Sequence, residues 1–234
     1  MLSLVMAIFE MINLQAEQEI HINRKSVAIM GGTFDPIHNG HLRTAVEILD
    51  LYQFSELRLI PCFQPVHKFR PVLLPEQRLA MVEMASHSDS RLLVDDREIN
   101  RKLPSYTIDT IKELRLELGE QTPLVMIVGM DSFLSFPTWK EWRQITNYAH
   151  VLVVARPNWE PVFVSELADL YENSRAHSMA ELQSEPAGKV YMETFTSLNI
   201  SSSMIRTLCR QKKSIAYLLP ESVQAFIEQH KLYL

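Results

Sequence analysis

Two histidines, His38 and His41, end a glycine-containing stretch, GGTFDPIHNGH, that begins at Gly31. A short apolar segment, 27–30, precedes the stretch, and apolar residues at helical spacing follow it. The stretch is therefore predicted to join the end of a strand to the start of a helix. Such a helix start presents free N–H groups and the positive end of the helix dipole, which favour anions. Two imidazoles beside this turn indicate contact with phosphate.

This string resembles the GxFDPxHxGH motif of the nucleotidyltransferase superfamily, and the match is contiguous. The resemblance implies that His38 and His41 contact nucleotide phosphates and stabilise the transition state at the α-phosphorus while pyrophosphate leaves. It also implies an ATP-binding role for the residues of the turn: Gly31, Gly32, Thr33 and Phe34. Three other interpretations are polar residues at a helix start, metal ligands, and a domain that keeps the turn without the chemistry. No nearby cysteine or carboxylate cluster completes a metal site.

A serine cluster near the end of the chain, Ser201, Ser202 and Ser203, precedes another helical pattern, and Arg206 follows one turn later. The string resembles the family's ISSTxIR signature, with Ser203 in place of the usual threonine. The resemblance implies that these residues grip the β- and γ-phosphates of ATP. A serine-rich helix start is weak evidence alone, but together with the histidine stretch it predicts two helix N-termini facing one triphosphate.

Further candidates follow the expected strands, where open α/β sheets gather their ligands. After strand 56–60 comes a proline-rich loop with His67 and Lys68. A PPHK string in the family occupies this loop and contacts the substrate phosphate, whereas here the string is PVHK. The alternative is a solvated basic loop.

Strand 124–128 is followed by Gly129 and Asp131, in a GxDS turn that approaches adenosine in the family. Strand 150–154 is followed by Arg156, which we expect near the nucleotide. Asp131 could equally cap a helix, and Arg156 could be an ordinary surface residue.

The string PSYT, which ends at Thr107, precedes a strong helical pattern over 108–118. Ser105 or Thr107 is predicted to cap this helix, and Gly119 to end it. A closely similar string borders the nicotinate pocket in the adenylyltransferases that make deamido-NAD. The resemblance therefore implies that Tyr106 and Thr107 bind nicotinate mononucleotide.

The string FPTW, which ends at Trp139, distinguishes most sharply among the nucleotidyltransferases. Thr138 is predicted to cap a short helix with Glu141 in the capping-box position, so that Trp139 lies just inside the helix start. There the indole would stack on the nicotinate ring beside N–H groups that bind its carboxylate. Lys140 is assigned to the same site, whereas Trp142 is expected in the core. The string is typical of nicotinate-nucleotide adenylyltransferases.

Composition limits the class of protein. The chain has 234 residues and a formal net charge of −5, so general binding to nucleic acid is not expected. No apolar run is long enough to span a membrane. Cys62 and Cys209 have no CxxC partner, which indicates free thiols in a reducing compartment, so we expect a cytoplasmic protein. Residues 1–23 are interpreted as an N-terminal extension or an added helix, and residues 24–234 as a single domain.

Strands alternate with helices along the chain, which predicts an α/β fold with a mainly parallel sheet. The resemblance covers about residues 25–234 and implies a Rossmann-like nucleotidyltransferase with a small helical part at about 198–234. The implied reaction joins ATP and nicotinate mononucleotide, with Mg²⁺ carried by the triphosphate and no metal site built from protein residues. The chain would act as a monomer or homo-oligomer. Nicotinamide-nucleotide, phosphopantetheine and glycerol-phosphate nucleotidyltransferases remain as alternatives, as does a nucleotide sensor without turnover.

Overall fold

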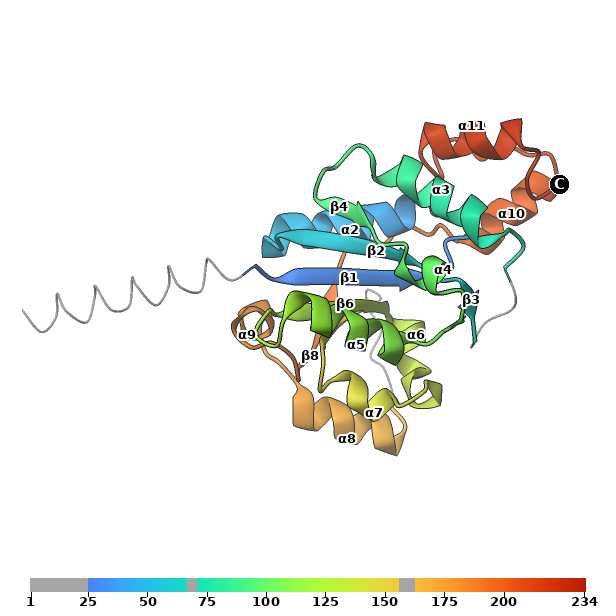
Figure 1. Ribbon diagram of the computed structural model, residues 1–234. Coiled ribbons are helices and arrows are strands. Elements are labelled where there is room, and N and C mark those ends of the chain that lie inside the picture. The colour runs from blue at the N-terminus through green and yellow to red at the C-terminus, as the bar shows by residue number, and fades with distance from the viewer. Residues whose placement is uncertain (1–24, 67–70, 156–162) are drawn as a thin grey trace, which may run out of the picture.

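The computed structural model describes residues 25–66, 71–155 and 163–234. Its centre is a six-stranded parallel sheet in the order β4-β2-β1-β6-β7-β8 (Figure 1). The strands are β1 (Val27–Gly32), β2 (Glu56–Pro61), β4 (Leu92–Val94), β6 (Leu124–Gly129), β7 (His150–Ala155) and β8 (Val190–Thr194), and β3 (Gln64–Pro65) pairs separately with β5 (Pro104–Ser105). The predicted α/β class and parallel sheet are confirmed.

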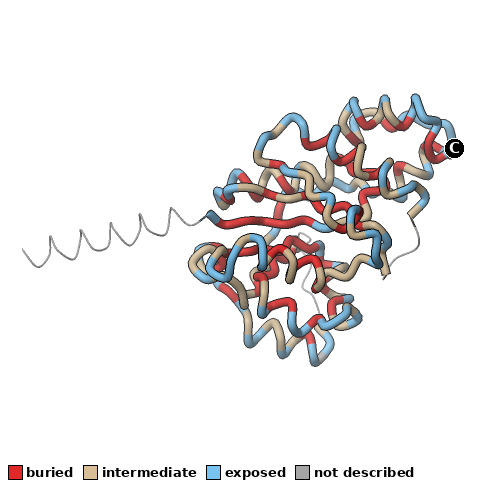
Figure 2. The backbone as a smooth tube through the Cα atoms, in the orientation of Figure 1, coloured by how far each residue is buried: buried red, intermediate tan, exposed pale blue. Residues whose placement is uncertain are grey.

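Helices cover both faces of the sheet because its strands are apolar on both sides. In β1, Ala28 and Met30 belong to one core cluster and Val27 and Ile29 to the other. The helices are α2 (Asn39–Tyr52), α3 (Pro75–Ser86), α4 (Arg97–Arg101), α5 (Thr107–Leu118), α6 (Met130–Leu134), α7 (Trp142–Ile145), α8 (Ser165–Ser174), α9 (Met179–Ser184), α10 (Ser202–Arg210) and α11 (Glu221–Gln229), with a 3₁₀ turn, η1 (Phe136–Thr138). Figure 2 shows the buried strands running between the two helical layers.

The order of the strands reverses direction at the centre of the sheet. From β1 the chain first builds outward through β2 to β4, and then returns to the other side of β1 with β6, β7 and β8. The carboxyl ends of β1 and β6 therefore border a crevice from which the helical connections diverge. In open α/β sheets this switch point is where ligands bind.

The C-terminal segment packs back onto the start of the fold. Helix α11 contacts α3, and the hydroxyl of Tyr233 donates a hydrogen bond of 2.7 Å to Oδ1 of Asp35. The other carboxylate oxygen of Asp35 accepts a hydrogen bond of 2.8 Å from the backbone N–H of Val72. The side chains of Asp35 and Tyr233 are both buried. One carboxylate thus joins three segments that are distant in the sequence.

Some element predictions were wrong in detail. The polarity of the stretch 95–99 predicts that it lies outside the core, yet Glu98 and Ile99 are buried in α4. The apolar pattern near the end of the chain predicts a last helix from Leu218, but α11 begins only after Pro220, whose ring fixes φ and suits a helix start. Gly119 does end α5, with φ at 84°. Within the described residues, no helix is both long and apolar enough to cross a bilayer.

Candidate functional site

The two histidines lie at the junction of β1 and α2. His38 is the N-cap of α2, and His41 lies in its first turn. Their rings stack with centroids 3.7 Å apart, and the backbone N–H of His38 donates to Nδ1 of His41 over 3.3 Å. Only 5% of His38 is exposed, and its Nδ1 is buried without a hydrogen-bond partner among the described residues. The helix start and the paired imidazoles therefore face the same crevice.

Two glycines of the turn pack closely against aromatic side chains. A Cβ atom on Gly32 would lie 2.8 Å from Cζ of Phe34, and one on Gly40 would lie 3.0 Å from the His38 ring. Phe34 itself has a positive φ of 48°, so the backbone bends sharply between the two glycines. By contrast, a Cβ on Gly31 would meet nothing within 4 Å.

The second helix start joins this turn. Ser201 caps α10 and accepts a hydrogen bond of 3.2 Å from the N–H of Met204. The hydroxyl of Ser202 donates to the carbonyl of Pro36 over 2.8 Å, and Nη1 of Arg206 donates to the carbonyl of Asp35 over 2.7 Å. The N-termini of α2 and α10 thus lie side by side, as the sequence predicted.

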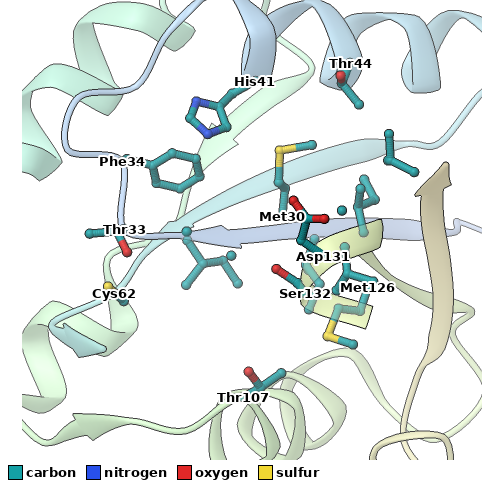
Figure 3. Close-up of a pocket in the computed structure, with 18 of the residues that line it drawn as sticks. Met30, Thr33, Phe34, His41, Thr44, Cys62, Thr107, Met126, Asp131 and Ser132 are labelled. Carbon is teal, nitrogen blue, oxygen red and sulfur yellow. The ribbon is translucent and has the colours of Figure 1, made fainter. Parts of the chain in front are cut away.

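A cavity of about 770 Å³ extends from the two histidines across the carboxyl ends of β1, β6 and β7. Figure 3 shows His41 and Phe34 at one side of this cavity and Thr107 at the opposite side. The predicted residues that line it are Gly31, Gly32, Thr33, Phe34, His38, His41, Thr107, Gly129, Asp131, Trp139 and Ser202. Its volume suits a ligand of nucleotide size.

Other predicted residues lie beside the cavity wall. Ser201, Ser203 and Arg206 are not part of the lining, although Arg206 bonds to the histidine turn. Tyr106 and Lys140 are not part of the lining either. Three predicted positions, His67, Lys68 and Arg156, fall outside the described residues.

The capping predictions around the aromatic strings were wrong. The hydroxyl of Thr138 donates to the carbonyl of Ser135, which closes η1, and α7 begins only at Trp142. Trp139 therefore lies between two short helical segments and not at a helix start, although its side chain lines the cavity. A proline at the second position of η1 favours this separate turn, and Glu141 has a left-handed backbone.

The start of α5 also differs from the expectation. Its N-cap is Tyr106, and no side chain caps it. The hydroxyl oxygen of Ser105 instead accepts a hydrogen bond of 3.0 Å from the N–H of Phe63. Lys140 forms an ion pair of 3.0 Å with Asp109 and lies 4.7 Å above the Tyr106 ring. Lys140 therefore contacts the start of α5 and does not line the cavity.

Comparison with known proteins gives the family. A model of cytidylyltransferase-like proteins matches residues 29–208. A probable nicotinate-nucleotide adenylyltransferase of Marinomonas sp. is 64% identical over 207 residues, which cover 88% of this chain and 94% of that protein. The chain belongs to the nicotinate-nucleotide adenylyltransferase family. A second such relative, from Hahella chejuensis, is 44% identical over 88% of this chain and 95% of that protein.

Solved structures agree on the fold. The nicotinic acid mononucleotide adenylyltransferase of Plasmodium falciparum, complexed with NaAD, superposes with a TM-score of 0.68 at 18% identity. The match covers 89% of this chain and 97% of that one. A structure from Vibrio parahaemolyticus, described as a putative nicotinate-nucleotide adenylyltransferase, gives 0.59 at 17% identity, over 89% of this chain and 95% of that one. The Rossmann-like fold expected for this family is confirmed.

Burial sets the protonation of the histidine that caps α2 in this family member. Desolvation lowers the pKa of His38 to about 4, so the ring is neutral at pH 7. Desolvation also lowers the pKa of His150, which is buried in β7. A neutral His38 imidazole keeps one N–H donor and carries no charge that would repel the helix dipole.

The lowered pKa of His38 predicts a pH-dependent stability. The unfolded chain binds a proton near pH 6.5, whereas the folded chain binds it only near pH 4. Between these values the unfolded state holds more protons, so acid favours unfolding. The stability that His38 contributes is full above about pH 6.5 and is lost as the pH falls to 4, by roughly 3 kcal/mol in all.

Urea unfolding of wild type and His38→Asn at pH 7, 6 and 5 measures this term. The variant should show the smaller loss of unfolding free energy on acidification, because asparagine does not bind a proton in this pH range. His150 is present in both proteins, so its contribution cancels in the comparison. His177→Asn, at an exposed position, should retain the wild-type slope. Equal slopes for wild type and His38→Asn would contradict the prediction.

Sequence reasoning missed several residues of the site. Glu98, Ser105 and Thr110 line the cavity beside Thr107. Arg78 is fully buried behind the turn, where Nη1 donates to the carbonyl of Thr33 over 2.7 Å. A carboxylate directly after a strand, as in the stretch 95–99, was the available signal for Glu98. Nothing in the local sequence around Arg78 indicated its partners.

Proposed function

We propose that this protein transfers the adenylyl group of ATP to nicotinate mononucleotide, giving deamido-NAD and pyrophosphate. The observation that carries the proposal is the single cavity that joins the histidine turn to Thr107 and Trp139. One end offers helix N-termini and imidazoles suited to phosphates, and the other offers an indole and a helix start suited to a flat, negatively charged ring. The names of the relatives support the same reaction.

At the phosphate end, we assign His38, His41 and Arg206 to the reacting phosphates. The imidazole N–H groups would donate to the oxygens of the α-phosphate as negative charge develops there. The backbone of the turn and the hydroxyls at the start of α10 would hold the rest of ATP. These ATP-binding residues are Gly31, Gly32, Thr33, Phe34, Ser201, Ser202 and Ser203, with Gly129, Asp131 and Arg156 near adenosine.

At the pyridine end, we assign Thr107 and Trp139 to the nicotinate ring. Tyr106 and Lys140 would support this end from behind, because Lys140 lies above the Tyr106 ring. His67 and Lys68 are proposed to contact the phosphate of nicotinate mononucleotide.

In the reaction, an oxygen of the nicotinate mononucleotide phosphate attacks the α-phosphorus of ATP. A new P–O bond forms, the bond between the α-phosphorus and the bridging oxygen breaks, and pyrophosphate carries away the electron pair. The attacking oxygen is already ionised at neutral pH, so no general base is needed. Catalysis then depends on in-line placement of the two reactants and on compensation of their combined negative charge.

Mg²⁺ would be carried by ATP. Within the described residues, no group of three or more histidine, cysteine, aspartate or glutamate side chains could hold a metal ion. Phosphate oxygens and water satisfy the octahedral coordination that Mg²⁺ prefers. The bound ion would offset part of the triphosphate charge.

The cellular setting is also a proposal. Cys62 and Cys209 are both buried and free, which suits a reducing compartment such as the cytoplasm. We further propose that residues 24–234 form one domain, with residues 1–23 as an extension. The chain would act as a monomer or homo-oligomer.

Pyrophosphate release in the presence of ATP and either nicotinate or nicotinamide mononucleotide tests the assignment. Nicotinate mononucleotide should give a kcat/KM about 10- to 100-fold higher, because the neutral amide leaves donors placed for a carboxylate unpaired. A preference for nicotinamide mononucleotide would overturn the substrate assignment. ATP binding without pyrophosphate release from either substrate would favour a nucleotide sensor.

A further inference from the structure

A buried carboxylate lies at the pyridine end of the cavity. Glu98 is only 7% exposed, and it lines the cavity together with Ser105 and Thr110. Burial raises the pKa of this carboxyl, while hydrogen bonds from the two hydroxyls and the charge of Arg101 oppose the rise. Neither the proposed phosphate chemistry nor the two main cores require an acid at this position.

Hydrogen bonds connect this carboxylate to three segments of the chain. The hydroxyl of Thr110 donates to Oε1 of Glu98 over 2.6 Å, and the Ser105 hydroxyl lies close enough to the carboxylate to lower its pKa. The Ser105 oxygen accepts from the N–H of Phe63 over 3.0 Å. Nη2 of Arg101 donates to the Thr110 oxygen over 3.0 Å, so that hydroxyl accepts one hydrogen bond and donates another.

The two segments fixed in this way form one wall of the cavity. Strand β3 pairs with β5 through only two residues each, Gln64 with Pro104 and Pro65 with Ser105. So short a ladder has little stability of its own. The carboxylate holds Ser105 from α4, and Ser105 in turn holds Phe63. Pro65 and Thr107, at the far ends of these segments, both line the cavity.

We propose that Glu98 is a positioning residue for the pyridine nucleotide. Through Ser105 and Thr110 it fixes the segment after β2 and the start of α5 at the spacing that nicotinate mononucleotide requires. The inference rests on the proposed function, since it concerns the pyridine end of that site. It predicts an effect on the KM for nicotinate mononucleotide and not on the KM for ATP. Among the described residues, the hydrogen bonds given above for Glu98, Ser105 and Thr110 go to one another, to Arg101 and to the backbone of Phe63, and none goes to the histidine turn, which Phe63 reaches only indirectly through Arg78.

Steady-state kinetics of Glu98→Gln and Glu98→Ala test the proposal. Alanine removes both acceptor oxygens and should raise the KM for nicotinate mononucleotide about 30- to 100-fold. Glutamine keeps one acceptor oxygen and should raise it about 3- to 10-fold. For both variants, kcat and the KM for ATP should stay within about twofold of wild type.

Glu113→Gln is the matched control. Glu113 forms an ion pair of 2.7 Å with Arg101 in the same cluster, but it does not line the cavity. This variant should leave both KM values unchanged. A double variant of Glu98→Gln and Thr110→Val should raise the KM by less than the product of the single effects, because both changes break the same hydrogen bond.

Three outcomes separate the possibilities. A selective rise in the KM for nicotinate mononucleotide, graded from glutamine to alanine, supports the proposal. An equal rise in both KM values, or no rise with Glu98→Gln, overturns it, and the glutamine variant decides if the alanine variant does not fold. Wild-type protein that releases no pyrophosphate from ATP and nicotinate mononucleotide would instead overturn the proposed function.

Discussion

Replacing His41 with alanine is expected to lower kcat for pyrophosphate release by about 10²- to 10³-fold, the usual cost of losing one donor to a developing charge. His41 stacks on His38 and lies edge-on to Phe34, with ring centroids 5.2 Å apart, so its imidazole is held against the cavity before ATP arrives. ATP binding should weaken only modestly, because the backbone N–H groups of the turn and the serines of α10 remain. The measurement is kcat from steady-state kinetics beside the Kd of ATP from calorimetry.

His87→Ala provides the control, because His87 is exposed just after α3. It should retain wild-type kcat and Kd. An unchanged turnover in His41→Ala would show that the imidazole does not act on the transition state, whereas a loss of ATP binding as large as the loss of kcat would assign it to ground-state binding.

Replacing Arg78 with alanine is expected to lower the free energy of unfolding by about 3 kcal/mol. The guanidinium is fully buried and donates to the carbonyls of Thr33 and Phe63, over 2.7 and 3.0 Å. Alanine would leave both carbonyls without this donor and create a cavity between α3 and the turn. The loss is measured by urea or guanidinium unfolding.

Arg78→Lys should recover part of this stability, since an ammonium can reach one carbonyl but cannot form the planar fork. Arg43→Ala is the matched control at an exposed position on α2, where Arg43 forms one ion pair within the described part of the chain, with Glu47 at 3.6 Å. It should cost less than about 0.5 kcal/mol. An Arg78→Ala protein as stable as Arg43→Ala would mean that the buried guanidinium costs as much to desolvate as its hydrogen bonds return.

The local structure of the histidine turn could be predicted from the sequence because its parts are close together in the chain. A strand end, two glycines and a helix start follow one another within the stretch from Gly31 to His41. The order of these local elements can therefore be predicted from contiguous residues. The helix start at the serines of α10 could be predicted for the same reason. The sheet was equally accessible, because its central strands are continuous apolar runs.

The rest of the site depends on partners that are distant in the sequence. A glutamate such as Glu98 is expected at the surface from its polarity. It can be buried because Ser105 and Thr110 interact with its carboxylate, and no sequence pattern links these two residues to Glu98. Trp139 lines the cavity, but the capping pattern predicted around it does not form. Short α9 was missed because it buries only Met179 and Leu182, too few residues for a helical pattern to emerge.

The hydrogen bond between Tyr233 and Asp35 links the segment after α11 with the turn that follows β1. Burial raises the pKa of Tyr233, so its hydroxyl stays protonated and keeps donating at any physiological pH. Without the Tyr233 hydroxyl, Oδ1 of Asp35 would lose this donor, although every residue assigned to ATP would still be present. The conformation of the turn that carries the two histidines is therefore coupled to a residue 198 positions further along the chain.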